Sequence, residues 1–322
     1  RDDYIGKKLL EILEDKAKEG VTVRILVDRI GSELSRKARK RLKKAGVSFA
    51  YSHRPAFPFF WTTLNRRNHR KIVVIDGKIG YLGGYNIGDE YLGRDVTIGF
   101  WRDFHLRLEH DGVQDLQRQF LKDWQRAKKT YTPRPSYYPP LKRGSTLINI
   151  HPSDGAHIEE TFQRFIKQAK KNIYLGTPYY IPSKSLQQEL IAAAKRGVDV
   201  KLIVPKKADH PFVGAAASAY CYDLLDAGVE IYQYYRGFYH AKALVVDDDF
   251  CDIGTANFDK RSLYINSEIN CLIYDPDFVS TVVRELKHDI SISSRLTLSS
   301  LKKRSIVKKG KEKLALLVSD LL

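Results

Sequence analysis

The chain is built from an internal duplication, and this feature limits its fold more than any other. Residues 16–27 read KAKEGVTVRILV, and residues 193–204 read AAKRGVDVKLIV. Each stretch has the pattern of the end of an amphipathic helix, a glycine stop and an apolar strand. A second pair of segments begins with Ala-Gly-Val at residues 45–47 and 227–229. Two halves that each alternate helices with apolar strands predict an α/β fold, in which helices flank a sheet.

The most informative repeat carries histidine and lysine. In both halves the pattern is His-x-Lys-x-x-x-x-Asp followed by Gly-x-x-Asn, and the asparagine lies 17 residues beyond the histidine. One such motif would arise by chance in roughly a few per cent of chains, whereas two copies in register make chance a poor explanation. The motif residues are His69, Lys71, Asp76 and Asn86 in the first half and His240, Lys242, Asp247 and Asn257 in the second.

A proline-rich segment at residues 131–140 separates the halves, since proline is excluded from helix interiors and central strands. We therefore predict a first half at 1–140 and a second half at 141–322, which ends in a basic tail. The second half opens with a strand near Leu147, a helix at 157–171 and a strand at 172–180. The first half has no counterpart of this opening unit, and we expect roughly 35 residues of its N-terminal part to be missing.

Side chains alternate between the two faces of a strand, so the histidine and lysine of each motif point the same way. Asp76 and Asp247 close the apolar runs that follow the lysines, and each heads a segment with the composition of a hairpin turn. We count the histidine, lysine and aspartate of each motif as catalytic residues. Within that set we expect the two aspartates to fix a turn rather than to meet substrate.

If the halves pack about a pseudo-two-fold axis, the motif residues converge into a site suited to a phosphodiester. The lysines, with Asn86 and Asn257, would bind the non-bridging oxygens, where negative charge accumulates in the transition state. One neutral imidazole would attack phosphorus, and the other would protonate the leaving oxygen. Each imidazole needs an acceptor on its second nitrogen, and Asp103 and Glu268 are the candidates. Either acid could instead be an ordinary structural carboxylate. We expect neither a metal nor a cofactor, because the cationic side chains take the place of a metal ion.

The charge balance favours a polyanionic partner. The chain has 55 Lys and Arg against 38 Asp and Glu, which gives a net charge of +17. Such a surplus suits nucleic acid or an anionic membrane surface, although a solvated basic surface is an equally good explanation. The cysteines at 221, 251 and 271 lie in or beside apolar stretches, so we predict that they are core residues. No apolar run is long enough to span a bilayer.

The motifs and their flanks resemble the phospholipase D superfamily and, within it, the bacterial cardiolipin synthases. The resemblance covers nearly the whole chain. It rests on NHRKIVVIDG at 68–77, GGYNIGDEYLGR at 83–94, WRD at 101–103, DHP at 209–211, GFYHAK at 237–242 and GTANFDKRS at 254–262. It implies an α/β fold of two repeated halves, each a mostly parallel mixed sheet flanked by helices, related by a pseudo-two-fold axis.

The resemblance also implies a phosphatidyl transfer. His69 would attack the phosphate of phosphatidylglycerol, glycerol would leave, and a second phosphatidylglycerol would displace the covalent phosphohistidine to give cardiolipin. His240 would be the general acid and then the base, although the pseudo-symmetry leaves these two roles reversible. A phospholipase D or nuclease that uses water as acceptor is the alternative within enzymes. A catalytically silent scaffold is the other alternative, against which the intact motifs argue.

Two segments are candidates for membrane contact. The stretch from Phe49 to Trp61 is rich in aromatic residues and is an insertion unique to the first half, which suits the interface of an anionic bilayer. A loop folded over the core is the alternative. The tail from Lys302 to Lys313 is rich in lysine and is followed by an apolar stretch, which suits either a surface-binding or a solvated helix. We expect phosphatidylglycerol and an anionic membrane surface as partners, nucleic acid to be unlikely, and a location at the cytoplasmic face of a bacterial cell membrane.

Overall fold

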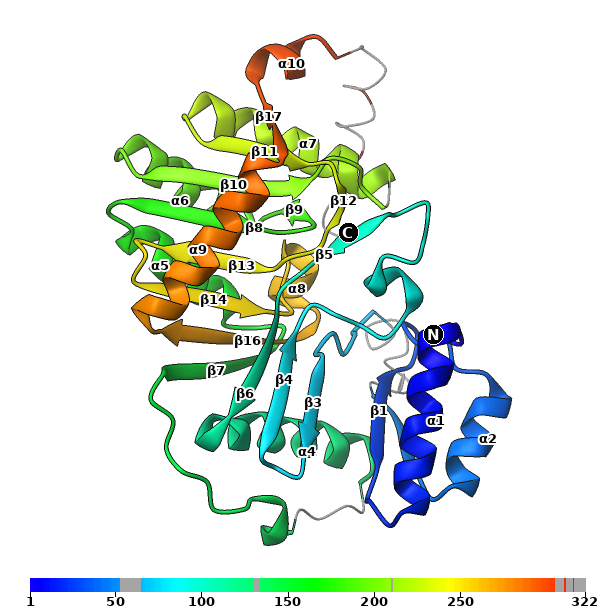
Figure 1. The fold of residues 1–322 in the computed structure, drawn as a ribbon. Coiled ribbons are helices and arrows are strands. Elements are labelled where there is room, and N and C mark those ends of the chain that lie inside the picture. The colour runs from blue at the N-terminus through cyan, green and yellow to red at the C-terminus, as the bar shows by residue number, and fades with distance from the viewer. Residues whose placement is uncertain (53–64, 130–133, 210, 305–309, 311–314, 316–322) are drawn as a thin grey trace.

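Helices and strands alternate through most of the chain, as the repeat predicts. The computed structural model describes residues 1–322 except for 53–64, 130–133, 210, 305–309, 311–314 and 316–322 (Figure 1). The first half contains α1 (Tyr4–Lys18), β1 (Arg24–Asp28), α2 (Arg36–Lys44), β2 (Ser48–Ser52), β3 (Ile72–Ile75), β4 (Ile79–Gly83), η1 (Asp89–Leu92), β5 (Phe100–Arg102), β6 (His105–Glu109), η2 (His110–Gly112), α4 (Val113–Ala127) and η3 (Pro135–Tyr137).

The second half begins as the sequence predicts, with a strand, a helix and a strand before the helix that repeats α1. It contains β7 (Leu147–Asp154), α5 (Ile158–Gln168), β8 (Asn172–Gly176), β9 (Tyr180–Ile181), α6 (Lys184–Lys195), β10 (Asp199–Pro205), α7 (Pro211–Asp226), β11 (Glu230–Tyr234), β12 (Gly237–Tyr239), β13 (Ala243–Val246), β14 (Phe250–Gly254), β15 (Phe258–Asp259), α8 (Lys260–Tyr264), β16 (Ser267–Tyr274), α9 (Pro276–Ser291), β17 (Ser293–Leu296) and α10 (Leu298–Lys302).

The described part of the second half is organised around one mixed sheet. Its strand order is β17-β11-β10-β8-β13-β14-β16-β7 (Figure 1). The sheet is mixed and flanked by helices, as predicted, but its parallel part is limited to β8, β10 and β11, and the other pairings are antiparallel. Strands joined by a short turn, such as β13 and β14, can pair only in the antiparallel sense, whereas parallel neighbours need a crossover helix.

The core of the second half lies on both faces of this sheet. Leu244 and Val246 of β13 face the cluster that includes α5 and α6, whereas Ala243 and Val245 face the cluster that includes α9. This alternation is the period of two expected for a strand that is buried on both sides. The three cysteines are buried in these clusters, as predicted from the sequence.

The first half has the same order of elements but a divided sheet. Strand β1 pairs only with β2, in parallel, while β3, β4 and β6 form a separate antiparallel sheet. In the second half the corresponding groups are joined by β8, which pairs with both β10 and β13. The described residues of the first half contain no strand at the position of β8, so β1 and β3 are not linked.

Several elements begin and end where local chemistry dictates. The side chains of Ser35 and Ser183 cap α2 and α6 by accepting hydrogen bonds from backbone amides in the first turn. The turn between β3 and β4 places Asp76 and Gly77 at φ 54° and 65°, and that between β13 and β14 places Asp247 and Asp248 at 56° and 60°. These positive values suit the hairpin turns that the sequence predicts.

The described part of the chain contains no helix with both the length and the apolarity to cross a membrane. Of the aromatic insertion, Phe49 and Tyr51 belong to β2, and residues 53–61 lie outside the described residues. Most of the basic tail also lies outside them, as does part of the proline-rich segment between the halves.

Candidate active site

The two halves meet along two short backbone pairings, and each brings a motif histidine beside an acid from the other half. Strand β12 leads into His240 and pairs in parallel with β5, which leads into Asp103. The amide of His240 donates to the last carbonyl of β5 over 2.8 Å. In the corresponding place, the amide of His69 donates to the carbonyl of Ser267, the neighbour of Glu268, over 2.9 Å. The sequence predicted both acids, and the structure shows that the halves exchange them.

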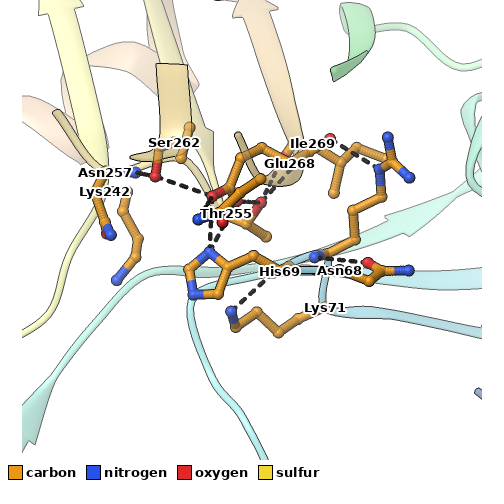
Figure 2. Close-up of polar contacts among 12 residues, drawn as sticks. Asn68, His69, Lys71, Lys242, Thr255, Asn257, Ser262, Glu268 and Ile269 are labelled. Atoms are coloured by element: carbon orange, nitrogen blue, oxygen red, sulfur yellow. Dashed lines mark hydrogen bonds and ion pairs between the residues drawn. The ribbon is translucent and has the colours of Figure 1, made fainter. Parts of the chain in front are cut away.

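The Nδ1 atom of His69 lies 2.8 Å and 3.0 Å from the two carboxylate oxygens of Glu268 (Figure 2). Burial raises the pKa of Glu268, but the neighbouring His69 and Lys71 outweigh it, so the pKa is lowered. The group is therefore a carboxylate, which only accepts hydrogen bonds, so Nδ1 donates, and in the neutral tautomer the lone pair is on Nε2. Glu268 also accepts hydrogen bonds from Thr255, Ser262 and Asn266.

His240 has the same relation to Asp103, in a more enclosed setting. Its Nδ1 lies 2.6 Å from Oδ2 of Asp103, and its ring centroid lies 4.7 Å from that of Trp101. Burial raises the pKa of Asp103, but Lys242 and His240 outweigh it, so this pKa is lowered too. For His240 itself, burial and the charge of Lys242 lower the pKa to about 3, so the imidazole is neutral in the free protein.

The two motif lysines occupy equivalent positions. The Nζ atom of Lys71 donates to the carbonyl of His69 over 2.8 Å, and that of Lys242 donates to the carbonyl of His240 over 2.6 Å. Burial in the site lowers the pKa of Lys71 to about 7 and that of Lys242 to about 8. An anion in the site would favour the charged form of both lysines.

The two asparagines expected to bind phosphate lie in different surroundings. The exposed Asn86 donates from Nδ2 to the hydroxyl of Tyr91 over 2.8 Å, and Tyr91 in turn packs near the ring of His240. Asn257 is buried and donates from Nδ2 to Asp259 over 3.0 Å. Its Oδ1 atom has no hydrogen-bond partner among the described residues. Asn86 is thus related to His240 through Tyr91, and Figure 2 shows Asn257 in the same close-up as His69 and Lys242. Their part in binding phosphate stays a prediction.

The two motif aspartates lie at the far ends of β3 and β13 from the histidines. The carboxylate of Asp247 accepts hydrogen bonds from the backbone amides of residues 170–172, which lead into β8. Asp76 occupies the corresponding turn at positive φ. Neither side chain is brought together with the histidines, which agrees with the expectation that they fix turns.

The sequence interpretation missed Arg70, the residue between the histidine and lysine of the first motif. Its side chain is 3% exposed and binds the carboxylate of Asp123 at 2.8 Å and 2.9 Å. It also donates to the backbone carbonyls of Glu268 and Ser153 in the second half. The strand period could have suggested this, because a residue between His69 and Lys71 must face away from the site and toward whatever lies behind it.

The arrangement can perform two-histidine chemistry at an anionic centre. Figure 2 shows Lys71 and Lys242 extending from the two halves toward the region of the His69 imidazole. The two histidines differ in access, because the His69 side chain is 27% exposed and the His240 side chain is 8% exposed. Within the described residues there is no group of three or more His, Cys, Asp or Glu side chains placed to hold a metal ion.

The chain is similar to a known protein family over most of its length. The family model described as "Cardiolipin synthase, PLD-like domain" matches residues 4–124 and 162–290. The chain is 46% identical to the minor cardiolipin synthase ClsB of Bacillus subtilis (strain 168), over 95% of this chain and 77% of that protein. It is 39% identical to a cardiolipin synthase of Clostridium perfringens (strain 13 / Type A), over 100% of this chain and 70% of that protein.

A solved structure shows the same fold at low identity. The phosphatidylserine synthase of Haemophilus influenzae Rd KW20 superimposes with a TM-score of 0.76 and 17% identity, over 100% of this chain and 88% of that chain. This likeness concerns the fold alone. The family model and the extent of the identity to its relatives show that the chain belongs to the cardiolipin synthases with a phospholipase D-like domain.

Proposed function

We propose that the protein is a cardiolipin synthase, a phosphatidyltransferase that joins two phosphatidylglycerol molecules and releases glycerol. The observation that carries the proposal is the pair of histidines, each held at Nδ1 by a carboxylate of the other half and accompanied by a lysine. An enzyme that forms and then breaks a phosphorus–nitrogen bond needs one imidazole for attack and another for proton transfer. Relatives that are named cardiolipin synthases support the choice of lipid.

In the first step, Nε2 of His69 attacks the phosphorus of phosphatidylglycerol. The phosphorus–oxygen bond to the glycerol headgroup breaks, and the glycerol oxygen takes a proton from Nε2 of His240. We assign attack to His69 because its side chain is the more exposed of the two, so a lipid phosphate can reach it. His240 is neutral in the free protein, and the anionic phosphate favours its protonated form when substrate binds.

In the second step, His240 takes the proton from a terminal hydroxyl of the second phosphatidylglycerol. The hydroxyl oxygen attacks phosphorus, the bond to Nε2 of His69 breaks, and cardiolipin leaves. Lys71, Lys242 and the two asparagines would stabilise the negative oxygens in both steps, because fixed donors cost little reorganisation when charge develops. Both lipids lie in a bilayer, so we also propose that the protein works at an anionic membrane surface of the bacterial cell.

The test is incubation of the protein with phosphatidylglycerol vesicles, followed by mass spectrometry of lipids and released headgroup. Cardiolipin and glycerol in equal amounts are the expected products. Phosphatidic acid without cardiolipin would mean that water is the final acceptor, and would replace the synthase with a hydrolase that uses the same residues. A matched sample of His69→Ala protein controls for contaminating activity.

A further inference from the structure

Helix α2 carries a concentration of positive charge that its counterpart in the second half lacks. Its sequence, RKARKRLKK, has seven Lys or Arg in nine residues and no acid. The corresponding helix, α7, precedes the second Ala-Gly-Val segment and has no Lys or Arg in its sixteen residues. Both helices cover a parallel pair of strands, β1-β2 or β10-β11, so the fold needs a helix here but not its charge.

The cations of α2 form one exposed face. Ala38 and Leu42 are buried and pack in a small apolar cluster with α1 and β2. The exposed positions 36, 37, 40, 41, 43 and 44 cover about 160° of the helix circumference on the other side, at about 100° per residue. Arg41 binds Glu14, but the lysines at 37, 40, 43 and 44 form no ion pair with any described residue. Figure 1 shows α2 at the outer edge of the molecule, with α1 beside it.

Only part of this charge can stabilise the helix: Arg41, Lys43 and Lys44 lie in the last turn, where the negative end of the helix dipole favours cations. Cations three and four residues apart, such as Lys40 and Lys44, repel each other. The first turn contains Arg36 and Lys37 and no acid, although the positive end of the helix dipole favours acidic residues there. A face whose first turn opposes the helix dipole, whose cations repel one another, and that the repeated half lacks is better explained by a partner than by stability.

The helix is also tied to the active site. The Asp28 carboxylate, at the end of β1, accepts hydrogen bonds from the amides of Ile30 and Gly31, in the loop that leads into α2. It also accepts one from the amide of Asn68, the residue before His69. Ile30 itself is 46% exposed. A surface bound to α2 would therefore lie against the half that provides the more accessible histidine, and the exposed apolar Ile30 belongs to the loop that leads into this helix.

We propose that α2 is the docking surface through which the protein binds an anionic phospholipid bilayer. The proposal rests on the proposed function, because that function places both substrates in such a bilayer. Each cation near an anionic leaflet strengthens binding by about fivefold, and an exposed isoleucine adds apolar contact with the interface. A lipid surface fits better than nucleic acid, since the exposed apolar residue has no use against a phosphate backbone.

The experiment compares two variants that lose the same charge. The α2 variant is Lys37→Gln/Lys40→Gln/Lys43→Gln/Lys44→Gln. The control removes four exposed cations from α6 and α9 of the second half, as Lys184→Gln/Lys195→Gln/Arg284→Gln/Lys287→Gln. Glutamine keeps a high helix propensity, so both proteins should fold, and circular dichroism would check this. Binding to vesicles of mixed phosphatidylglycerol and phosphatidylcholine is measured by co-sedimentation, with phosphatidylcholine vesicles as reference.

We expect the α2 variant to lose about a hundredfold or more in affinity for the phosphatidylglycerol vesicles, and the control to lose far less. Equal losses in the two variants would overturn the proposal, as would unchanged binding by the α2 variant. Binding of duplex DNA that depends on α2, with vesicle binding unaffected, would assign the helix to nucleic acid instead.

Activity on phosphatidylglycerol dispersed in detergent separates this proposal from the proposed function. The α2 variant should match the wild-type protein in detergent and fall behind it on vesicles. A wild-type protein that makes no cardiolipin in detergent would remove the proposed function, while the vesicle-binding comparison would still test α2 as a lipid-binding surface.

Discussion

In the second half, β8 joins β10 to β13, and helices cover both faces of the sheet; in the first half, the corresponding strands form two separate sheets. The difference shows in equivalent residues of the catalytic strands. Leu244 and Val246 of β13 are 1% and 3% exposed, whereas Val73 and Ile75 of β3 are 49% and 47% exposed. Within the described residues, the second half therefore buries its motif strand in its own core, whereas one face of β3 in the first half is exposed.

The two acids show the same inequality. Glu268 of the second half accepts from three side chains besides His69, and Thr255 beside it is part of the Gly-x-x-Asn element. The residue of the first half that corresponds to Thr255 is Gly84. A side-chain Cβ atom there would lie about 2.2 Å from the carboxylate oxygens of Asp103, so no hydroxyl can take the place of that of Thr255. Because the acids are exchanged, the well-supported Glu268 holds His69 of the less supported half. The stronger framework thus orients the more accessible histidine.

The largest expected effect comes from removing either histidine. His69→Ala and His240→Ala should each reduce turnover by at least about 10⁴-fold, because both bond-making steps need both imidazoles. The comparison is sharpened by a substrate with a nitrophenol leaving group, which needs no acid. On it, His240→Ala should still accumulate a phosphohistidine detectable by mass spectrometry, and His69→Ala should not. A phosphohistidine at His240 would reverse the two roles.

Replacing the acids by amides should have the next largest effect. In Glu268→Gln the amide oxygen would keep the place of Oε1, where it accepts from Ser262 and Asn266. The NH₂ group would then take the place of Oε2, 2.8 Å from His69 Nδ1, and force the proton onto Nε2. We expect kcat to fall by about 10³- to 10⁴-fold, against about 10²- to 10³-fold for Asp103→Asn, since a proton on Nε2 suits an acid better than a nucleophile. Equal losses would indicate that the histidines are not divided into nucleophile and acid as proposed.

The contact between the halves is tested at Arg70. Arg70→Ala removes the hydrogen bonds to the carbonyls of Glu268 and Ser153 in the second half. It also takes the closest cation from the buried carboxylate of Asp123, which keeps only Gln119 and the more distant Arg126, so it should lower the free energy of unfolding by about 3–5 kcal/mol in urea denaturation. Alanine itself is tolerated, because Ala241 occupies the equivalent position in the second half and is fully buried. Adding Asp123→Asn should recover part of the loss. A small effect of Arg70→Ala would mean that the halves hold together without this contact.

The smallest expected effect is on the pH profile. Burial depresses the pKa of Lys71 to about 7 and that of Lys242 to about 8, both below the usual value for lysine. Only the protonated amines bind an anion, so kcat/KM should be constant below about pH 7 and fall as pH rises through 7 to 8, by up to about tenfold per unit for each lysine. Lys71→Arg should remove the fall in kcat/KM near pH 7 and leave the fall near pH 8, which belongs to Lys242. A profile flat to pH 9 would contradict both shifts.

Much of the fold could be predicted from the sequence because local patterns decide it. The helix ends, glycine stops, hairpin turns and the strand-helix-strand opening of the second half all depend on neighbours in the chain. The mostly parallel sheet was the weaker part of the expectation. Apolar runs show that a strand is buried, but they do not show which strand lies beside it. A short turn decides the antiparallel pairing of β13 with β14, whereas β16 pairs with β7, from the start of the second half, and only tertiary packing decides that.

The sequence by itself determined the duplication, the paired motifs and the two acids, because repetition and residue type are visible in one dimension. Only the tertiary structure decided that Asp103 meets His240 and Glu268 meets His69, that Arg70 joins the halves, and that one histidine is more accessible than the other. A repeat in sequence makes the two halves look equivalent. Packing makes them unequal, because burial and hydrogen bonding depend on which residues from distant parts of the chain become neighbours.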